Sequence, residues 1–64
     1  MMTSEQVANM RRSLLSKVEI KVGDKKIFGI WNEMQLDAGT GLIDGIYVGE
    51  KLYRLSEIDY MLVR

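Results

Sequence analysis

Apolar residues in the first part of the chain follow a helical pattern. Val7, Met10 and Leu14 recur at the three- and four-residue spacing of an amphipathic helix. The sequence Thr-Ser-Glu-Gln at residues 3–6 fits a capping box, in which Thr and Gln satisfy backbone N–H groups at the helix start. Together these features predict a helix over residues 4–16.

The pattern changes near residue 17 to the alternation of a half-buried strand. Apolar and charged side chains alternate over residues 18–22, and Gly23-Asp24 provides the two-residue loop of a type II′ hairpin turn. The return strand, over residues 25–36, is apolar on both faces and contains Gly29, which is typical of a strand that bends sharply in a small barrel. Pairing across the turn places Ile20 opposite Ile27 and Val18 opposite Gly29, with Phe28 and Ile30 on the other face.

The rest of the chain predicts three further strands. Val48-Gly49-Glu50-Lys51 repeats the turn chemistry of the first hairpin, Val-Gly-acid-Lys. Residues 1–64 are therefore interpreted as one domain, mainly β with one N-terminal helix, in which residues 18–63 form a small five-stranded antiparallel barrel or meander of the SH3-like or Sm-like kind. The later strands are expected at 42–48, 51–55 and 60–63, with a tight turn at 56–59.

Two stretches carry a resemblance to known families. A helix leading into residues 18–30, with a turn and a Gly in the bent second strand, resembles the start of Sm-like and Hfq-like barrels. Residues 51–61, Lys-Leu-Tyr-Arg-Leu-Ser-Glu-Ile-Asp-Tyr-Met, are similar to the closing strands of those barrels and to the C-terminal half of the YolD-like family of short bacterial and phage proteins. The resemblance implies a barrel that tends to form rings or dimers.

RNA binding does not follow from this resemblance. Sm-like proteins carry an Asp-and-Asn signature after the bent strand, where this chain has Asn-Glu-Met-Gln-Leu at residues 32–36. Ser56-Glu57 replaces the basic-Gly pair of the turn between the last two strands. No RNA-binding residue of the family is therefore transferred to this sequence.

The residue types that the chain lacks limit its chemistry. It has no Cys and no His, which removes disulfides, thiolate metal sites and the commonest general base. Catalysis would have to rely on carboxylates, and so short a chain offers little sheltered cleft for two of them. We therefore expect a protein that is not an enzyme and that uses no cofactor and no metal.

High apolar content in a short chain predicts self-association. Hydrophobic residues make up 47% of the sequence, more than a domain of this size buries well by itself. The expected contacts are the helix face of Val7, Met10 and Leu14 and the last strand, over residues 60–63. No signal-like segment and no apolar run of ~20 residues is present, so a cytoplasmic location without membrane contact is expected.

One loop has the chemistry of a ligand site. Asp37, Gly39, Thr40 and Gly41 resemble a phosphate-binding loop, in which glycines allow close backbone approach and Thr adds a hydroxyl. The alternative is a flexible connection, because no helix follows the loop.

Aromatic and basic residues offer further contacts. Trp31, Tyr47 and Tyr53 would either stack on a ligand or fill the core or a subunit interface. The net charge is zero, but residues 1–26 carry six basic against three acidic residues, and the remainder is acidic. A basic face for an anionic partner and an ordinary solvated surface both fit this pattern. The contacts of an anionic partner would be Arg11, Arg12, Lys25 and Lys26.

Two hypotheses follow for the function. The first is a non-enzymatic, self-associating small-barrel module that binds and modulates a partner protein, as phage- or plasmid-borne effectors do. The second is a protein that binds nucleic acid or sequesters a small nucleotide through the loop at residues 37–41 and the basic residues. Zero net charge places nucleic acid below a protein partner.

Overall fold

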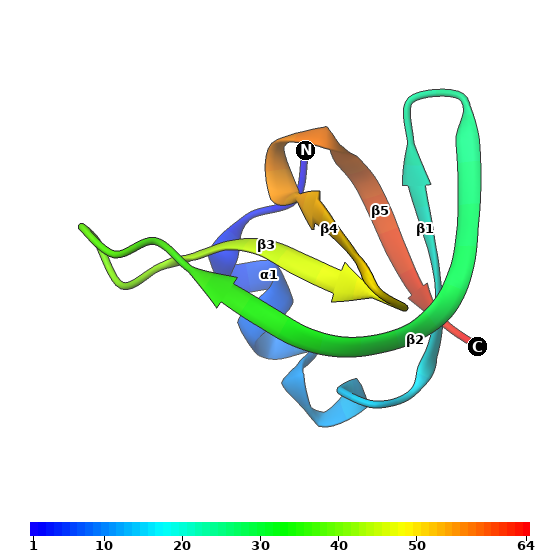
Figure 1. Ribbon diagram of the computed structural model, residues 1–64, viewed down its shortest axis with the longest axis horizontal. Helices are drawn as coiled ribbons and strands as arrows, with labels where there is room; N and C mark the ends of the chain where they lie inside the picture. The colour runs from blue at the N-terminus through cyan, green and yellow to red at the C-terminus, as the bar shows by residue number, and fades with distance from the viewer.

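The five predicted strands are present and form one antiparallel sheet. The computed structural model describes residues 1–64, with strands β1 (Lys17–Val22), β2 (Lys25–Leu36), β3 (Ile43–Val48), β4 (Lys51–Arg54) and β5 (Ile58–Val63). Their order in the sheet is β4-β3-β2-β1-β5. The sheet is strongly curved, and β2 sweeps around one side of the molecule (Figure 1). β4 and β5 are edge strands that do not pair with each other, so the sheet is not closed into a barrel.

The N-terminal helix is shorter than predicted. Helix α1 runs over Ser4–Asn9 and is followed by a 3-10 turn, η1 (Arg11–Ser13), so the prediction of a helix over residues 4–16 is wrong at its C-terminal end. Leu15 has a φ of +74°, which lies outside the helical region. Its N–H donates to the Trp31 carbonyl at 2.7 Å, and the Trp31 N–H donates to the Ser16 carbonyl at 3.0 Å. The chain therefore leaves the helix to pair with β2.

The predicted capping box is confirmed. The Thr3 hydroxyl accepts a hydrogen bond from the Gln6 N–H at 3.1 Å, and the Gln6 side chain accepts one from the Thr3 N–H at 2.8 Å. A helix of six residues is too short to be stable alone, so α1 also depends on its buried Val7. The Ile43 N–H donates to the Ser4 hydroxyl at 2.9 Å, which ties α1 to β3.

Both hairpins have the predicted turns. Gly23 and Gly49 begin two-residue turns with φ values of +60° and +64°, in the left-handed region that glycine adopts without strain. The predicted register of the first hairpin is confirmed as well. Ile20 faces Ile27, and Val18 faces Gly29.

β2 is the most strongly bent strand of the sheet, and its two halves pair with different strands (Figure 1). Its first half, residues 25–30, pairs with β1, and the rest pairs with β3 from Trp31 onward. Gly29 lies just before this change of partner. A Cβ atom at Gly29 would lie 3.0 Å from Cγ1 of Val48 on β3, so the missing side chain allows the two strands to approach.

A single hydrophobic core lies between the sheet and α1. Trp31 is fully buried at its centre, and α1 packs behind β3 (Figure 1). Because successive residues of a strand point to opposite faces, the residues that alternate with the core positions face outward. The buried apolar residues are Met2, Val7, Val18, Ile20, Trp31, Ile46, Val48, Leu55, Ile58 and Met61.

We expect Gly29→Val to lower the free energy of unfolding by about 1–3 kcal/mol, because overpacking forces neighbouring groups to move. Cγ1 of Val48 lies where the new side chain would begin. Urea denaturation followed by circular dichroism measures the effect. Glu33→Val, at an exposed position of the same strand, is the matched control and should change stability by no more than about 0.5 kcal/mol. Equal losses in the two variants would contradict the role given to Gly29.

Candidate functional site

The outward-facing residues of β2, β1 and β5 form a continuous surface, which we call the outer face. Pairing between the strands arranges these residues in three rows across the sheet. The rows are Ile30, Lys17 and Arg64; then Phe28, Glu19 and Leu62; then Lys26, Lys21 and Tyr60.

Three apolar side chains are exposed on the outer face. Phe28 is 57% exposed, Leu62 45% and Ile30 42%. Single exposed apolar residues are ordinary on any protein, but apolar residues gathered on one surface mark sites of interaction. The register of the strands places all three on the same side of the sheet.

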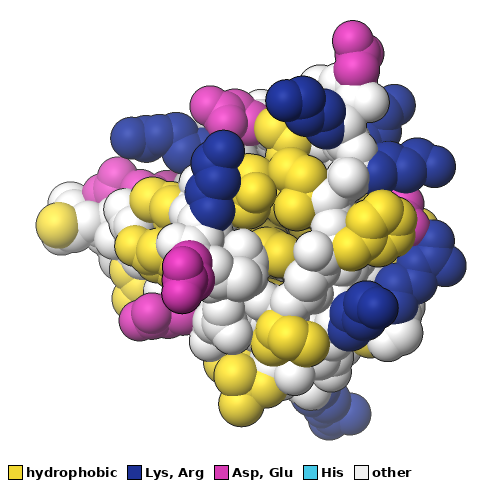
Figure 2. All heavy atoms as spheres, turned by 45° about the vertical axis from the view of Figure 1, so that its right-hand side comes forward, with side chains coloured by type: hydrophobic (Ala, Val, Ile, Leu, Met, Phe, Trp, Pro, Cys, Tyr) yellow, Lys and Arg dark blue, Asp and Glu magenta, His cyan; other side chains and the backbone are white.

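The outer face presents positive charge to solvent. Its cations are Lys17, Lys21, Lys26 and Arg64, and its one acidic side chain, Glu19, is only 2% exposed. In Figure 2, Lys and Arg side chains gather over the right-hand part of the view, whereas most Asp and Glu side chains lie toward the left. A partner that approaches the outer face therefore meets cations and apolar groups.

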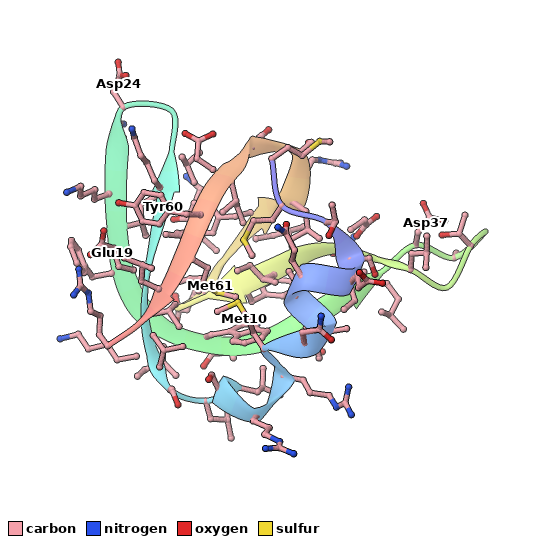
Figure 3. The ribbon with its side chains drawn as sticks, turned by 180° about the vertical axis from the view of Figure 1, so that it is seen from behind. Met10, Glu19, Asp24, Asp37, Tyr60 and Met61 are labelled. Atoms are coloured by element: carbon pink, nitrogen blue, oxygen red, sulfur yellow. The ribbon has the colours of Figure 1, made fainter.

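Glu19 is held by two residues from the end of the chain. The Tyr60 hydroxyl donates to Glu19 Oε2 at 2.7 Å, and Arg64 donates to Oε1 through Nε at 3.1 Å and also through Nη2. Figure 3 shows Glu19 and Tyr60 close together on neighbouring strands. The hydrogen bonds from Arg64, and then that from Tyr60, lower the pKa of Glu19 below its ordinary value. The carboxylate is therefore ionised at neutral pH, and its two oxygens are occupied by these neighbours.

In the loop at residues 37–41, the backbone N–H groups that could bind a phosphate are already hydrogen-bonded within the loop. Asp37 Oδ1 accepts hydrogen bonds from the N–H groups of Gly39 at 2.7 Å and Thr40 at 3.0 Å. The bond from Thr40, and then that from Gly39, lowers the pKa of Asp37. The Gly41 N–H donates to the Asp37 carbonyl at 2.7 Å. This geometry favours the alternative that the loop connects β2 and β3.

The structure keeps the three predicted aromatic contacts apart. Trp31 is fully buried, so it belongs to the core and is not accessible to a ligand. Tyr53 faces Ile46 and packs against the core, whereas Tyr47 faces Leu52 and therefore lies on the opposite face of the sheet. Figure 3 also places Asp37, at the start of its loop, at the other end of the molecule from Tyr60.

The predicted basic residues do not form one surface. Arg11 and Arg12 lie in η1, and Lys25 and Lys26 follow the first hairpin turn, at the opposite end of β1 (Figure 1). Only Lys26 belongs to the outer face.

Sequence reasoning missed three cations of the outer face, Lys17, Lys21 and Arg64. Lys17 and Lys21 could have been placed on this face from the sequence. The predicted hairpin register already sets Lys17 opposite Ile30 and Lys21 opposite Lys26. Arg64 required the knowledge that β5 pairs with β1.

An open hollow of about 380 Å³ lies between α1 and β5. Met10 and Met61 line it and lie next to each other in Figure 3. Its titratable residues are Asp59 and Tyr60, and the Tyr60 hydroxyl is already hydrogen-bonded to Glu19.

Two further structural features concern metals and membranes. No group of three or more Asp, Glu, His or Cys side chains is arranged to hold a metal ion. No helix combines the length and the apolar character needed to cross a lipid bilayer.

Comparison with protein-family models, with curated proteins and with solved structures found no match for this chain. Its function is therefore argued from the outer face and from the residues that shape it.

The stability of the fold should depend on pH through Glu19. Its pKa is lower in the folded protein than in the unfolded chain, so the carboxylate stabilises the fold at neutral pH, and this contribution is lost as the pH falls through the folded-state pKa. The difference in unfolding free energy between the wild type and Glu19→Gln should be largest above about pH 6 and should shrink toward about pH 3.

Urea denaturation at a series of pH values measures this difference. Glu33→Gln, at an exposed position on β2, is the matched control and should leave stability nearly unchanged at neutral pH. A difference for Glu19→Gln that stays constant from neutral to acid pH would rule out the proposed contribution of the carboxylate.

Proposed function

We propose that this chain is a non-enzymatic interaction module that binds a partner protein through the outer face. The observation that supports this function is the exposure of Phe28, Leu62 and Ile30 among four cations. Protein interfaces combine an apolar centre with a polar rim, and complementary charge steers the two partners together. The matching surface on the partner would therefore be apolar and acidic.

A protein surface suits the outer face better than a nucleic acid does. Proteins that bind single strands stack bases on several aromatic side chains. Here Phe28 is the one exposed aromatic residue of the outer face, since Tyr60 is half-buried and hydrogen-bonded to Glu19. Ile30 and Leu62 are aliphatic and fit apolar side chains of a protein. The occupied N–H groups of the loop at residues 37–41 likewise argue against a nucleotide.

We also infer that the curved sheet is a partly open barrel of the SH3-like or Sm-like kind. The strand order, the sharing of β2 between β1 and β3, and the short 3-10 turn η2 (Leu55–Glu57) between β4 and β5 support this architecture. A rigid sheet of this kind presents contact residues at fixed positions, which lowers the entropic cost of binding.

Self-association remains part of the proposal; the predicted edge strand β5 is kept as a contact, and the predicted helix face is replaced. Val7 is fully buried within the chain, and Met10 and Leu14 pack against the core, so this helix face is already used. The unpaired edges of β4 and β5 and the exposed Leu36 and Leu42 are available for contact with a second copy.

The protein interface can be tested by photo-crosslinking in cells that naturally make this protein. With p-benzoylphenylalanine in place of Phe28, we expect one or a few defined adducts with a protein, and excess wild-type chain should compete them away. The same group in place of Leu15, which is 69% exposed and lies outside the outer face, is the control. Equal adducts from both positions, or adducts with nucleic acid alone, would refute the proposed function.

Self-association predicts a species heavier than the 7.4 kDa chain at about 100 μM and a melting temperature that rises with concentration. Analytical ultracentrifugation and thermal denaturation across a dilution series measure both quantities. A monomer at every concentration, with a constant melting temperature, would contradict self-association.

A further inference from the structure

Arg64 is the one cation of the outer face whose side chain is fixed by hydrogen bonds. Nε and Nη2 both donate to Oε1 of Glu19, whereas Lys17, Lys21 and Lys26 have no ion pair. Glu19 is itself immobile, since it is buried and also accepts the hydrogen bond from Tyr60. The guanidinium is therefore held in one orientation before any partner arrives.

The other end of this guanidinium is free. The Arg64 side chain is 53% exposed, and its contacts with Glu19 use only the side formed by Nε and Nη2. A guanidinium has five N–H donors in a planar fork, so both N–H groups of Nη1 and one of Nη2 remain. This free end has the geometry that binds a carboxylate through two parallel hydrogen bonds.

The surroundings of Arg64 favour an acidic side chain that is flanked by apolar ones. Lys17 is its neighbour across the sheet, where the Arg64 N–H donates to the Lys17 carbonyl at 2.8 Å. Ile30 lies beyond Lys17 in the same row, and Leu62 is in the adjacent row. The only side-chain carboxylate of the outer face, that of Glu19, is already hydrogen-bonded, so a carboxylate from outside meets no exposed acidic side chain here.

We propose that Arg64 is a preorganised anchor for a carboxylate of the partner protein and that Glu19 is its positioning residue. The partner segment then carries an Asp or Glu side chain next to apolar side chains that pack on Leu62, Ile30 and Phe28. This inference rests on the proposed function and names the chemistry of the partner. Preorganisation matters because a side chain that is already immobile loses less entropy on binding.

A model peptide tests the anchor without knowledge of the natural partner. The probe is a fluorescent synthetic peptide with alternating Glu and Leu residues, and its matched control has Gln in place of every Glu. Fluorescence anisotropy measures the affinity, and the NMR signal of the Arg64 Nε–H reports the site directly. We expect the Glu peptide to bind, to shift this signal, and to bind about tenfold more tightly than the Gln peptide.

Arg64→Lys keeps the charge but removes the planar fork, and it should weaken binding about tenfold. Arg54→Lys is the matched control, because Arg54 is exposed on β4, outside the outer face, and binding should not change. Equal affinity of the wild type and Arg64→Lys would overturn the anchor.

Glu19→Gln distinguishes the positioning of Arg64 by Glu19 from a general attraction between the positive outer face and the acidic peptide. The substitution makes the outer face more positive, so a diffuse electrostatic attraction would grow and the acidic peptide would bind more tightly. Loss of a positioning residue predicts the opposite, a weaker complex and a broadened Arg64 Nε–H signal. The variant is measured at a temperature where circular dichroism shows it to be folded, and Arg64→Lys provides the independent test if no such temperature exists.

The outcomes distinguish this inference from the proposed function. If the wild type ignores the Glu peptide but crosslinks to a protein through residue 28, the carboxylate anchor is wrong and the protein-binding function stands. If an oligo(dT) strand binds more tightly than the Glu peptide and displaces it, both the anchor and the protein-binding function are wrong.

Discussion

The architecture depends on a single strand that serves two partners. β2 pairs with β1 over its first half and with β3 over its second, and it bends between the two halves. The close approach of Val48 to Gly29 permits the bend, and the bend carries Trp31 into the centre of the core. The alternation of side chains along the same strand turns Phe28 and Ile30 outward, so β2 supplies residues to both the core and the outer face.

The network around Glu19 links the stability of the fold to the character of its surface. Tyr60 and Arg64 both come from the segment that forms the edge of the sheet, and both hydrogen-bond to a residue of β1. The network therefore holds the edge strand in place. At the same time it withdraws the one acidic side chain of the outer face from solvent, which leaves the cations of this face to set its electrostatic potential. The buried charge of Glu19 thus affects both the attachment of β5 to β1 and the charge that the outer face presents to a partner.

Features governed by neighbours in sequence were predictable, and those that join distant segments were not. The capping box, the two glycine turns and the register of the first hairpin follow from residues within a few positions of each other. The helix ended early because Leu15 pairs with Trp31, a contact that no local pattern reveals. The ion pair of the outer face joins residues 45 positions apart and requires the order of the strands. The loop at residues 37–41 kept two interpretations at the level of sequence because its composition suits both an anion site and a turn that satisfies its own hydrogen bonds.

The middle row of the outer face inverts the usual relation between side-chain chemistry and exposure. Its acid, Glu19, is buried, whereas its aromatic residue, Phe28, is open to solvent. In a map of mutational tolerance selected for folding alone, Glu19 would group with the core residues and Phe28 with the permissive surface. In a map selected for function in the native cell, substitutions at Phe28 would no longer be tolerated. The tolerance at Glu19 would stay as low as in the first map. Comparison of the two maps would therefore outline the contact surface residue by residue before any partner is known.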